Sequence, residues 1–111
     1  MAINFLDIPR LNPGYREGRT ADFDEVEIRP SGGQVAEQAK RCMNCGIPFC
    51  HGAGCPLDNN IPDFNAAVRE NRLRDAYYIL SQTSPFPEFT SRICPALCEA
   101  SCTAGLPSEP V

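Results

Sequence analysis

Seven cysteines dominate the chemistry that this 111-residue sequence could perform. The first group runs Cys42-x2-Cys45-x4-Cys50-x4-Cys55-Pro, and the second runs Cys94-Pro-x2-Cys98-x3-Cys102. A cubane iron–sulfur cluster needs four ligands around a compact core, and closely spaced loop cysteines with one distant cysteine can supply them. The spacing therefore predicts 4Fe–4S clusters.

The prolines after Cys55 and Cys94 suggest how the ligands divide. In two-cluster bacterial ferredoxins, the cysteine that precedes a proline ligates the other cluster. By this rule Cys42, Cys45 and Cys50 hold one cluster with a distant partner, while Cys55 joins the second group. Seven thiolates then divide as four and three. Either the eighth ligand is not a cysteine, or one cluster has an open iron, or only one cluster forms.

Structural zinc and disulfides are the alternative uses of these cysteines. Zinc sites favour paired Cys-x2-Cys knuckles, and only Cys42 and Cys45 have that spacing. His51 is a further candidate zinc ligand, although a single loop histidine is more often a polar surface group. The odd cysteine count argues against a closed set of disulfides. Lys40, Arg41 and Arg92 flank the cysteine groups and are interpreted as solvated charges, with a role in offsetting cluster charge as the alternative.

Several functional classes lack their signatures. No Gly-x-Gly-x-x-Gly motif follows a strand pattern, and no Ser/His/Asp set or carboxylate pair has motif spacing, so the chain itself is predicted to carry no dinucleotide or catalytic site. The net charge of −4 argues against a nucleic-acid partner. The N-terminus does not resemble a signal peptide, and the apolar stretches are too short for a membrane span. A cytoplasmic location without membrane contact is expected.

The composition indicates a weak apolar core. Hydrophobic residues reach 42%, but alanine and cysteine supply much of this fraction, tryptophan is absent and proline occurs eleven times. Few large apolar side chains in a short chain leave folding close to balance against chain entropy. The fold is therefore predicted to depend on its clusters.

The sequence pattern predicts an all-α domain with cysteine-rich loops, and residues 42–58, which hold the first cysteine group, are expected to be loop throughout. Residues 1–30 are expected to form an extended N-terminal arm or, alternatively, a partly disordered terminus. Helical signals occur in four segments: about 31–41, 60–71, 73–81 and 95–105. In the first of these, Val35, Ala39 and Cys42 share a face, which should carry Cys42 to the interior. Segment 85–87 is expected to break the chain, and segment 85–89 either to fill the core beneath a cluster or to dock a partner or the flavin domain.

Several segments carry a resemblance to a known family. They are RCMNCGIPFCH (41–51), GCPL (54–57), IPDFN (61–65), FPEFT (86–90), RICPA (92–96), Cys98-Glu99 and, in the arm, NPGYR (12–16). With them the sequence resembles the small (beta) subunit of NADPH-dependent glutamate synthase, whose N-terminal iron–sulfur domain is similar to that of dihydropyrimidine dehydrogenase. The likeness covers nearly the whole chain. One departure is the x4 spacing between Cys50 and Cys55, where the family often has x3.

The resemblance implies a small helical ferredoxin-like domain over residues 31–105 with two 4Fe–4S clusters. Cys42, Cys45, Cys50 and Cys102 would bind the first cluster, and Cys55, Cys94 and Cys98 the second. The family completes the second cluster with a glutamate or glutamine after the last cysteine, here beyond Val111. It also places flavin and NADPH domains downstream, so residues 106–111 are expected to begin a linker to them, and FAD and NADPH are expected only there.

The implied function is electron relay within an oxidoreductase. The clusters would pass electrons between NADPH-reduced FAD and the large (alpha) subunit, which makes glutamate from glutamine and 2-oxoglutarate. The implied partners are the flavin and NADPH domains of the same protein and that large subunit. Two alternatives stay open. One is a related flavin-dependent NAD(P)H oxidoreductase, of the ferredoxin:NADP or pyrimidine reductase type, and the other is a zinc-stabilised interaction module.

Overall fold

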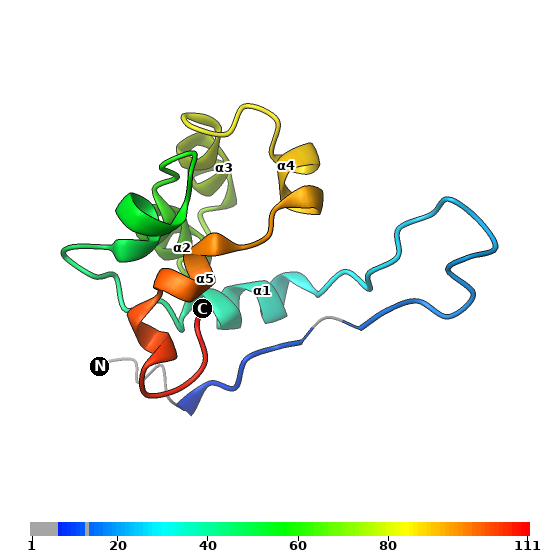
Figure 1. The fold of residues 1–111 in the computed structure, drawn as a ribbon, viewed down its shortest axis with the longest axis horizontal. Coiled ribbons are helices and arrows are strands. Elements are labelled where there is room, and N and C mark those ends of the chain that lie inside the picture. The colour runs from blue at the N-terminus through cyan, green and yellow to red at the C-terminus, as the bar shows by residue number, and fades with distance from the viewer. Residues whose placement is uncertain (1–6, 13) are drawn as a thin grey trace.

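Short helices joined by loops form the body of the protein (Figure 1). The structure, a computed structural model, describes residues 7–12 and 14–111. Its elements are α1 (Gly32–Ala39), the π-helical turn η2 (Cys50–Gly54), α2 (Ile61–Arg69), α3 (Leu73–Ser81), α4 (Pro87–Ile93), α5 (Leu97–Ser101) and the 3-10 turn η3 (Thr103–Gly105). The only strand-like pairing among the described residues is one isolated bridge, between Tyr15 and Glu27. The predicted all-α class is confirmed.

Helix α1 starts at a capping box. The Ser31 hydroxyl accepts a hydrogen bond from the Gln34 backbone N–H at 3.2 Å, and the Gln34 side chain accepts one from the Ser31 N–H at 2.9 Å. Each bond satisfies a backbone donor that the first helical turn would leave without a partner. The helix ends at Ala39, two residues before the predicted end, so Cys42 lies in the loop that follows rather than on the helix.

Helices α2 and α3 form a tight pair. Pro62 lies in the first turn of α2, where its missing N–H is not needed. After α2, Asn71 adopts a left-handed conformation with a φ of 60°, and the next residue, Arg72, donates its N–H to the Ala67 carbonyl at 2.8 Å. This closure turns the chain directly into α3. The predicted bounds of α3, 73–81, are confirmed.

Three local predictions were wrong. Segment 85–87 does not simply break the chain, because Pro87 fits the first turn of a helix and opens α4. The first cysteine group is not loop throughout, since it contains the turn η2. The helix predicted over 95–105 is divided: Ala96 is left-handed with a φ of 54°, so α5 begins only at Leu97, and η3 follows it as a separate turn.

The arm is a long hairpin that projects beyond the helices (Figure 1). Its two legs are joined by backbone hydrogen bonds from Arg16 to Val26 at 2.8 Å and from Ile28 to Gly14 at 2.9 Å. The first leg is attached to α1 by Gln38, whose side chain donates to the Pro9 carbonyl at 3.0 Å and accepts from the Leu11 N–H at 2.9 Å. The arm is extended, as one of the two expectations had it; residues 1–6 and 13 lie outside the described part.

The buried apolar side chains of the described residues are small, namely Pro62 and the alanines Ala39, Ala67, Ala76 and Ala104. Large apolar side chains on α4 and just before it are exposed instead: Phe86 at 63%, Phe89 at 65% and Ile93 at 82%. The interpretation of segment 85–89 as a core plug is therefore wrong. In the part of the chain that the structure describes, every helix is too short or too polar to cross a membrane.

Candidate iron–sulfur site

Five of the seven cysteines line one cavity of about 280 Å³. They are Cys42, Cys45, Cys50, Cys98 and Cys102. Cys42 and Cys45 come from the loop after α1, and Cys50 opens η2. Cys98 lies in α5, and Cys102 directly follows it. The four cysteines predicted for the first cluster therefore reach one cavity from segments up to 60 residues apart, with Cys98 beside them.

The remaining two cysteines, Cys55 and Cys94, do not line this cavity. Cys55 directly follows η2, and Cys94 directly follows α4 and is exposed. Burial raises the pKa of the Cys98 thiol, and the nearby sulfurs of Cys94 and Cys55 raise it further. The structure thus brings Cys55 and Cys94 close enough to Cys98 for their charges to act on its thiol. Cys98 borders both groups, so the assignment of each cysteine to a cluster stays a prediction.

The chemistry of the cavity favours a positively charged core. Burial raises the pKa of the Cys50 thiol, and although the His51 backbone N–H opposes this, the sulfurs of Cys42, Cys102 and Cys98 add to the rise. Mutual repulsion of this kind makes several thiolates unfavourable unless a cation binds among them. Iron bound by thiolates would remove the repulsion, so the donor set fits an iron–sulfur cluster.

Gly54 packs the first cysteine group directly on the second. A Cβ at this position would lie 2.8 Å from the Cys98 Cα and 2.9 Å from the Ser101 Oγ, so only glycine fits between η2 and α5. Gly54 is itself buried. The contact fixes the distance from Cys98 of α5 to Cys50, which opens η2, and to Cys55, which directly follows it.

Two sulfurs have hydrogen-bond partners outside the cysteine set. The Ala96 N–H donates to the Cys94 Sγ, two residues earlier in the chain, at 3.3 Å. The Thr103 Oγ1 lies 3.8 Å from the Cys45 Sγ, within hydrogen-bonding range for sulfur. Hydrogen bonds to ligand sulfurs are among the factors that set cluster potentials. Spacing rules alone did not indicate either partner.

His51 has a structural partner. Its Nδ1 lies 2.9 Å from the Asn59 carbonyl oxygen, which can only accept, so Nδ1 carries the proton. The contact joins η2 to the segment that leads into α2.

Within residues 7–12 and 14–111, no three His, Cys, Asp or Glu side chains converge closely enough to share a single ion.

The flanking cations differ from one another. Lys40 pairs with Glu37, and Arg92 pairs with Glu25 on the arm; both pairs are at the surface, as expected of solvated charges. Arg41 is 1% exposed, so its interpretation as a solvated charge was wrong. Its burial could not be read from a helical pattern, because α1 ends before it.

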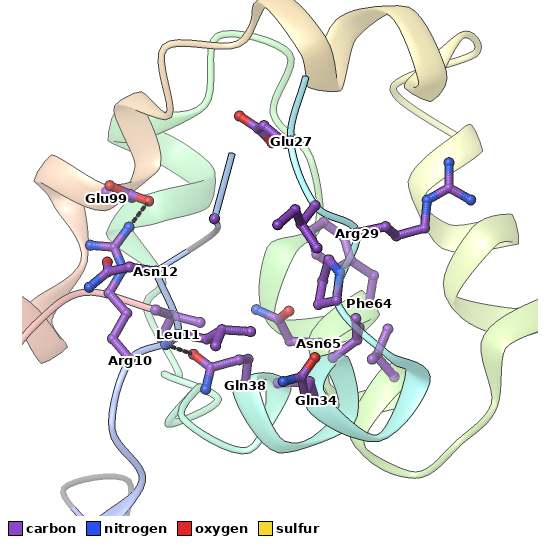
Figure 2. A pocket seen from close by; sticks show the side chains of 17 residues that line it. Arg10, Leu11, Asn12, Glu27, Arg29, Gln34, Gln38, Phe64, Asn65 and Glu99 are labelled. Carbon is purple, nitrogen blue, oxygen red and sulfur yellow. Dashed lines mark hydrogen bonds and ion pairs between the residues drawn. The ribbon is translucent and has the colours of Figure 1, made fainter. Parts of the chain in front are cut away.

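A second cavity, of about 620 Å³, lies between the arm, α1 and α2 (Figure 2). Gln34 and Gln38 of α1 and Asn65 of α2 supply amide groups to it. Arg10 spans one side and forms an ion pair with Glu99 at 2.5 Å. Val111 lines both this cavity and the cysteine-lined one, so the two share a wall at the C-terminal segment.

Comparison with known proteins identifies a family. Residues 19–111 match the family model of dihydropyrimidine dehydrogenase domain II, 4Fe–4S cluster. The match includes all seven cysteines and excludes the first leg of the arm.

The chain is similar to parts of several glutamate synthases. The chain is 50% identical over 93 residues to the glutamate synthase [NADPH] small chain of Mycobacterium tuberculosis, covering 84% of this chain and 19% of that protein. It is 41% identical over 116 residues to the Bacillus subtilis small chain, covering 96% and 23%. It is 51% identical over 110 residues to glutamate synthase [NADH] of Saccharomyces cerevisiae, covering 96% and 5%. The chain thus spans about a fifth of the length of these small chains.

Proposed function

Because this chain belongs to the family of dihydropyrimidine dehydrogenase domain II, a 4Fe–4S cluster domain, we propose that it relays electrons through two 4Fe–4S clusters. The observation that carries the proposal is the cavity lined by five cysteines, which two distant parts of the chain supply. Bound clusters provide one-electron chemistry, while the protein holds them and sets their potentials through hydrogen bonds, charge and burial.

The proposed ligands follow the two groups of cysteines. Cys42, Cys45, Cys50 and Cys102 hold the first cluster, and all four line the cavity. Cys55, Cys94 and Cys98 hold the second, whose fourth ligand is a residue after Val111. Support for this division comes from the electrostatic proximity of Cys94 and Cys55 to Cys98.

The proposed reaction context is glutamate synthesis. The relatives are glutamate synthase small chains, and this chain is an iron–sulfur domain related to them. We propose that flavin and NADPH domains follow residues 106–111, and that electrons pass between NADPH-reduced FAD and a large subunit making glutamate from glutamine and 2-oxoglutarate. The reducing cytoplasm keeps the thiols available for this role. A related flavin-dependent reductase would use the same cysteines, so the final electron acceptor is the point to test.

Cysteine variants test the ligand division. The anaerobically purified 111-residue chain should contain iron and acid-labile sulfide and absorb broadly in the visible range. Cys42→Ser should remove most of this absorption because it opens the complete cage. Cys94→Ser, the matched control, should leave the first cluster in place. Equal losses in both variants would contradict the division, and a colourless zinc-loaded protein would overturn the cluster proposal in favour of a zinc module.

A longer chain tests the second cluster and the acceptor. If the fourth ligand lies after Val111, extending the chain through the following domains should raise the iron content by about four atoms per chain. An unchanged iron content would contradict the downstream ligand. The extended protein should then reduce its large-subunit partner with NADPH, and reduction of ferredoxin or pyrimidines instead would assign it to the related reductases.

A further inference from the structure

Arg41 is a buried cation, and its hydrogen bonds within the described residues all go to backbone carbonyls. Its side chain donates from Nε to Ile8 at 3.1 Å, from Nη1 to Pro110 at 2.9 Å and from Nη2 to Glu109 at 2.8 Å. With 1% of its surface exposed, it is the largest fully buried side chain of the described residues. These bonds join the start of the arm, the end of α1 and the C-terminal segment at one point.

The charge of Arg41 has no acidic partner. The ion pairs of the described residues all use other cations, and residues 1–6 and 13 contain no aspartate or glutamate. An isolated buried charge is strongly unfavourable unless something nearby compensates it. Carbonyl dipoles compensate it in part, but they carry no net charge. The folded chain thus contains a buried positive charge that calls for an anion.

Two neighbours of these groups in the chain line the cysteine-lined cavity. Cys42 follows Arg41 directly, and Val111 directly follows Pro110, whose carbonyl Arg41 binds. Both Cys42 and Val111 line the cavity. A cluster held there by four thiolates carries net negative charge, and one-electron reduction adds one more unit. Nearby net charge is one of the factors that set the potential of a cluster.

We propose that Arg41 is a positioning residue that supplies the compensating charge for the first cluster and thereby raises its reduction potential. The inference rests on the proposed function, since it requires a cluster bound by Cys42, Cys45, Cys50 and Cys102. The step concerned is the gain of one electron from a one-electron donor such as dithionite, with no bond made or broken. Because the buried guanidinium attracts the additional negative charge, it favours the reduced state.

Redox titration of the anaerobically reconstituted 111-residue chain tests the proposal. Arg41→Met removes the charge and keeps an unbranched side chain. We expect the equilibrium constant for one-electron reduction of the first cluster to fall at least about tenfold, which is about 59 mV for one electron. Arg41→Lys cannot span three carbonyls but keeps the charge. Because the charge is kept, this variant should recover most of the potential. Lys40→Met, a surface cation one residue away, is the matched control and should shift the constant less than about twofold.

Each outcome decides one question. If the unmodified chain binds no cluster, the proposed function fails and the inference fails with it. If Arg41→Met binds its cluster with an unchanged potential, only the inference fails. If Arg41→Met cannot hold a cluster, the Arg41→Lys variant is informative. A cluster retained in Arg41→Lys would show that the cluster needs the positive charge at this position. Loss of the cluster in both variants would reduce Arg41 to a structural clamp and overturn the proposal.

Discussion

At the scale of single residues, Gly54 determines how the two cysteine groups meet. The turn η2 carries Cys50 and leads into Cys55, and Gly54 places this turn against the backbone of α5 at Cys98. A side chain at position 54 would collide with main-chain atoms, which cannot move out of the way as a flexible side chain can. The relative positions of ligands from both groups therefore depend on a residue that has no ligand atom.

Gly54→Ala should lower cluster occupancy. Because the added methyl would lie 2.8 Å from the Cys98 Cα, η2 and α5 must separate, and overpacking of this kind typically destabilises by about 1–3 kcal/mol. Iron and sulfide per chain and the thermal midpoint should both fall. Gly52→Ala is the matched control, since a Cβ there meets no atom within 4 Å. Equal behaviour of the two variants would contradict the packing argument.

Residue type and spacing identify the cysteines as candidate cluster ligands. They do not reveal the structural roles of Gly54 or Arg41. Thiol clusters are recognisable because few other uses explain seven cysteines in 111 residues. The importance of Gly54 comes from α5, more than forty residues later, and the burial of Arg41 depends on carbonyls 33, 68 and 69 residues away. Local patterns contain no information about such distant partners. Arginine next to a predicted ligand was the available signal, and it was interpreted as a surface charge.

At the scale of elements, both legs of the arm are tied to the helical body. Gln38 of α1 holds its first leg, and near the return of the hairpin Glu25 accepts hydrogen bonds from Arg92 of α4, one of them at 3.0 Å from Nε. The hydrogen bond from Arg92 and its charge lower the pKa of Glu25. Both side chains are about half exposed, so solvent and salt weaken the pair.

Glu25→Gln should loosen the arm without disturbing the clusters. Amide hydrogen exchange at Arg16 and Ile28, whose N–H groups join the two legs, should become faster, while iron content stays constant. High salt should act on the unmodified chain in the same direction. Because the pKa of Glu25 is lowered in the folded state, the contribution of the pair persists through neutral pH. It is lost only as the pH falls below the ordinary glutamate value of about 4.3 and through the lowered one.

Glu17→Gln, an exposed acidic residue of the same arm, provides the comparison. It should leave exchange at Arg16 and Ile28 unaltered. Faster exchange in both variants would indicate a general effect of arm charge and contradict a specific contact between the arm and α4.

Helix bounds were predictable from the sequence where apolar spacing and a stop residue were both present. The bounds of α3 follow from a clear apolar period after a left-handed Asn71. Helix α4 was missed because a Pro-Phe-Pro segment resembles a break, although proline in a first turn is also a start signal. The late start of α5 depends on a left-handed alanine, a conformation that alanine rarely adopts and that its sequence does not reveal.

At the scale of the whole molecule, the described apolar core is too small to account for folding alone. It consists of four alanines and Pro62, and each buried methyl or methylene contributes only about 0.8 kcal/mol. Large apolar side chains remain on the surface instead of adding to it. Ligation by cysteines from both ends of the helical body would supply the missing stabilisation.

Removal of iron should therefore unfold much of the chain. Treatment with a strong chelator and a mild oxidant should abolish the visible absorption, and the far-UV circular dichroism of the helices should fall with it. Restoring iron, sulfide and a reductant should recover both signals. Persistence of the full helical signal in iron-free protein would show that the helices are stable on their own.

The contacts of Arg41 also bear on the order in which parts of the chain can fold during synthesis. Its partners lie 33, 68 and 69 residues away, so local helices can form long before these bonds do. During synthesis the chain emerges from its N-terminus onward, and Cys102 precedes the Glu109 and Pro110 carbonyls that Arg41 needs. All seven cysteines therefore precede these carbonyls in the chain, and the cavity wall near Val111 is the last part of the site to be synthesised.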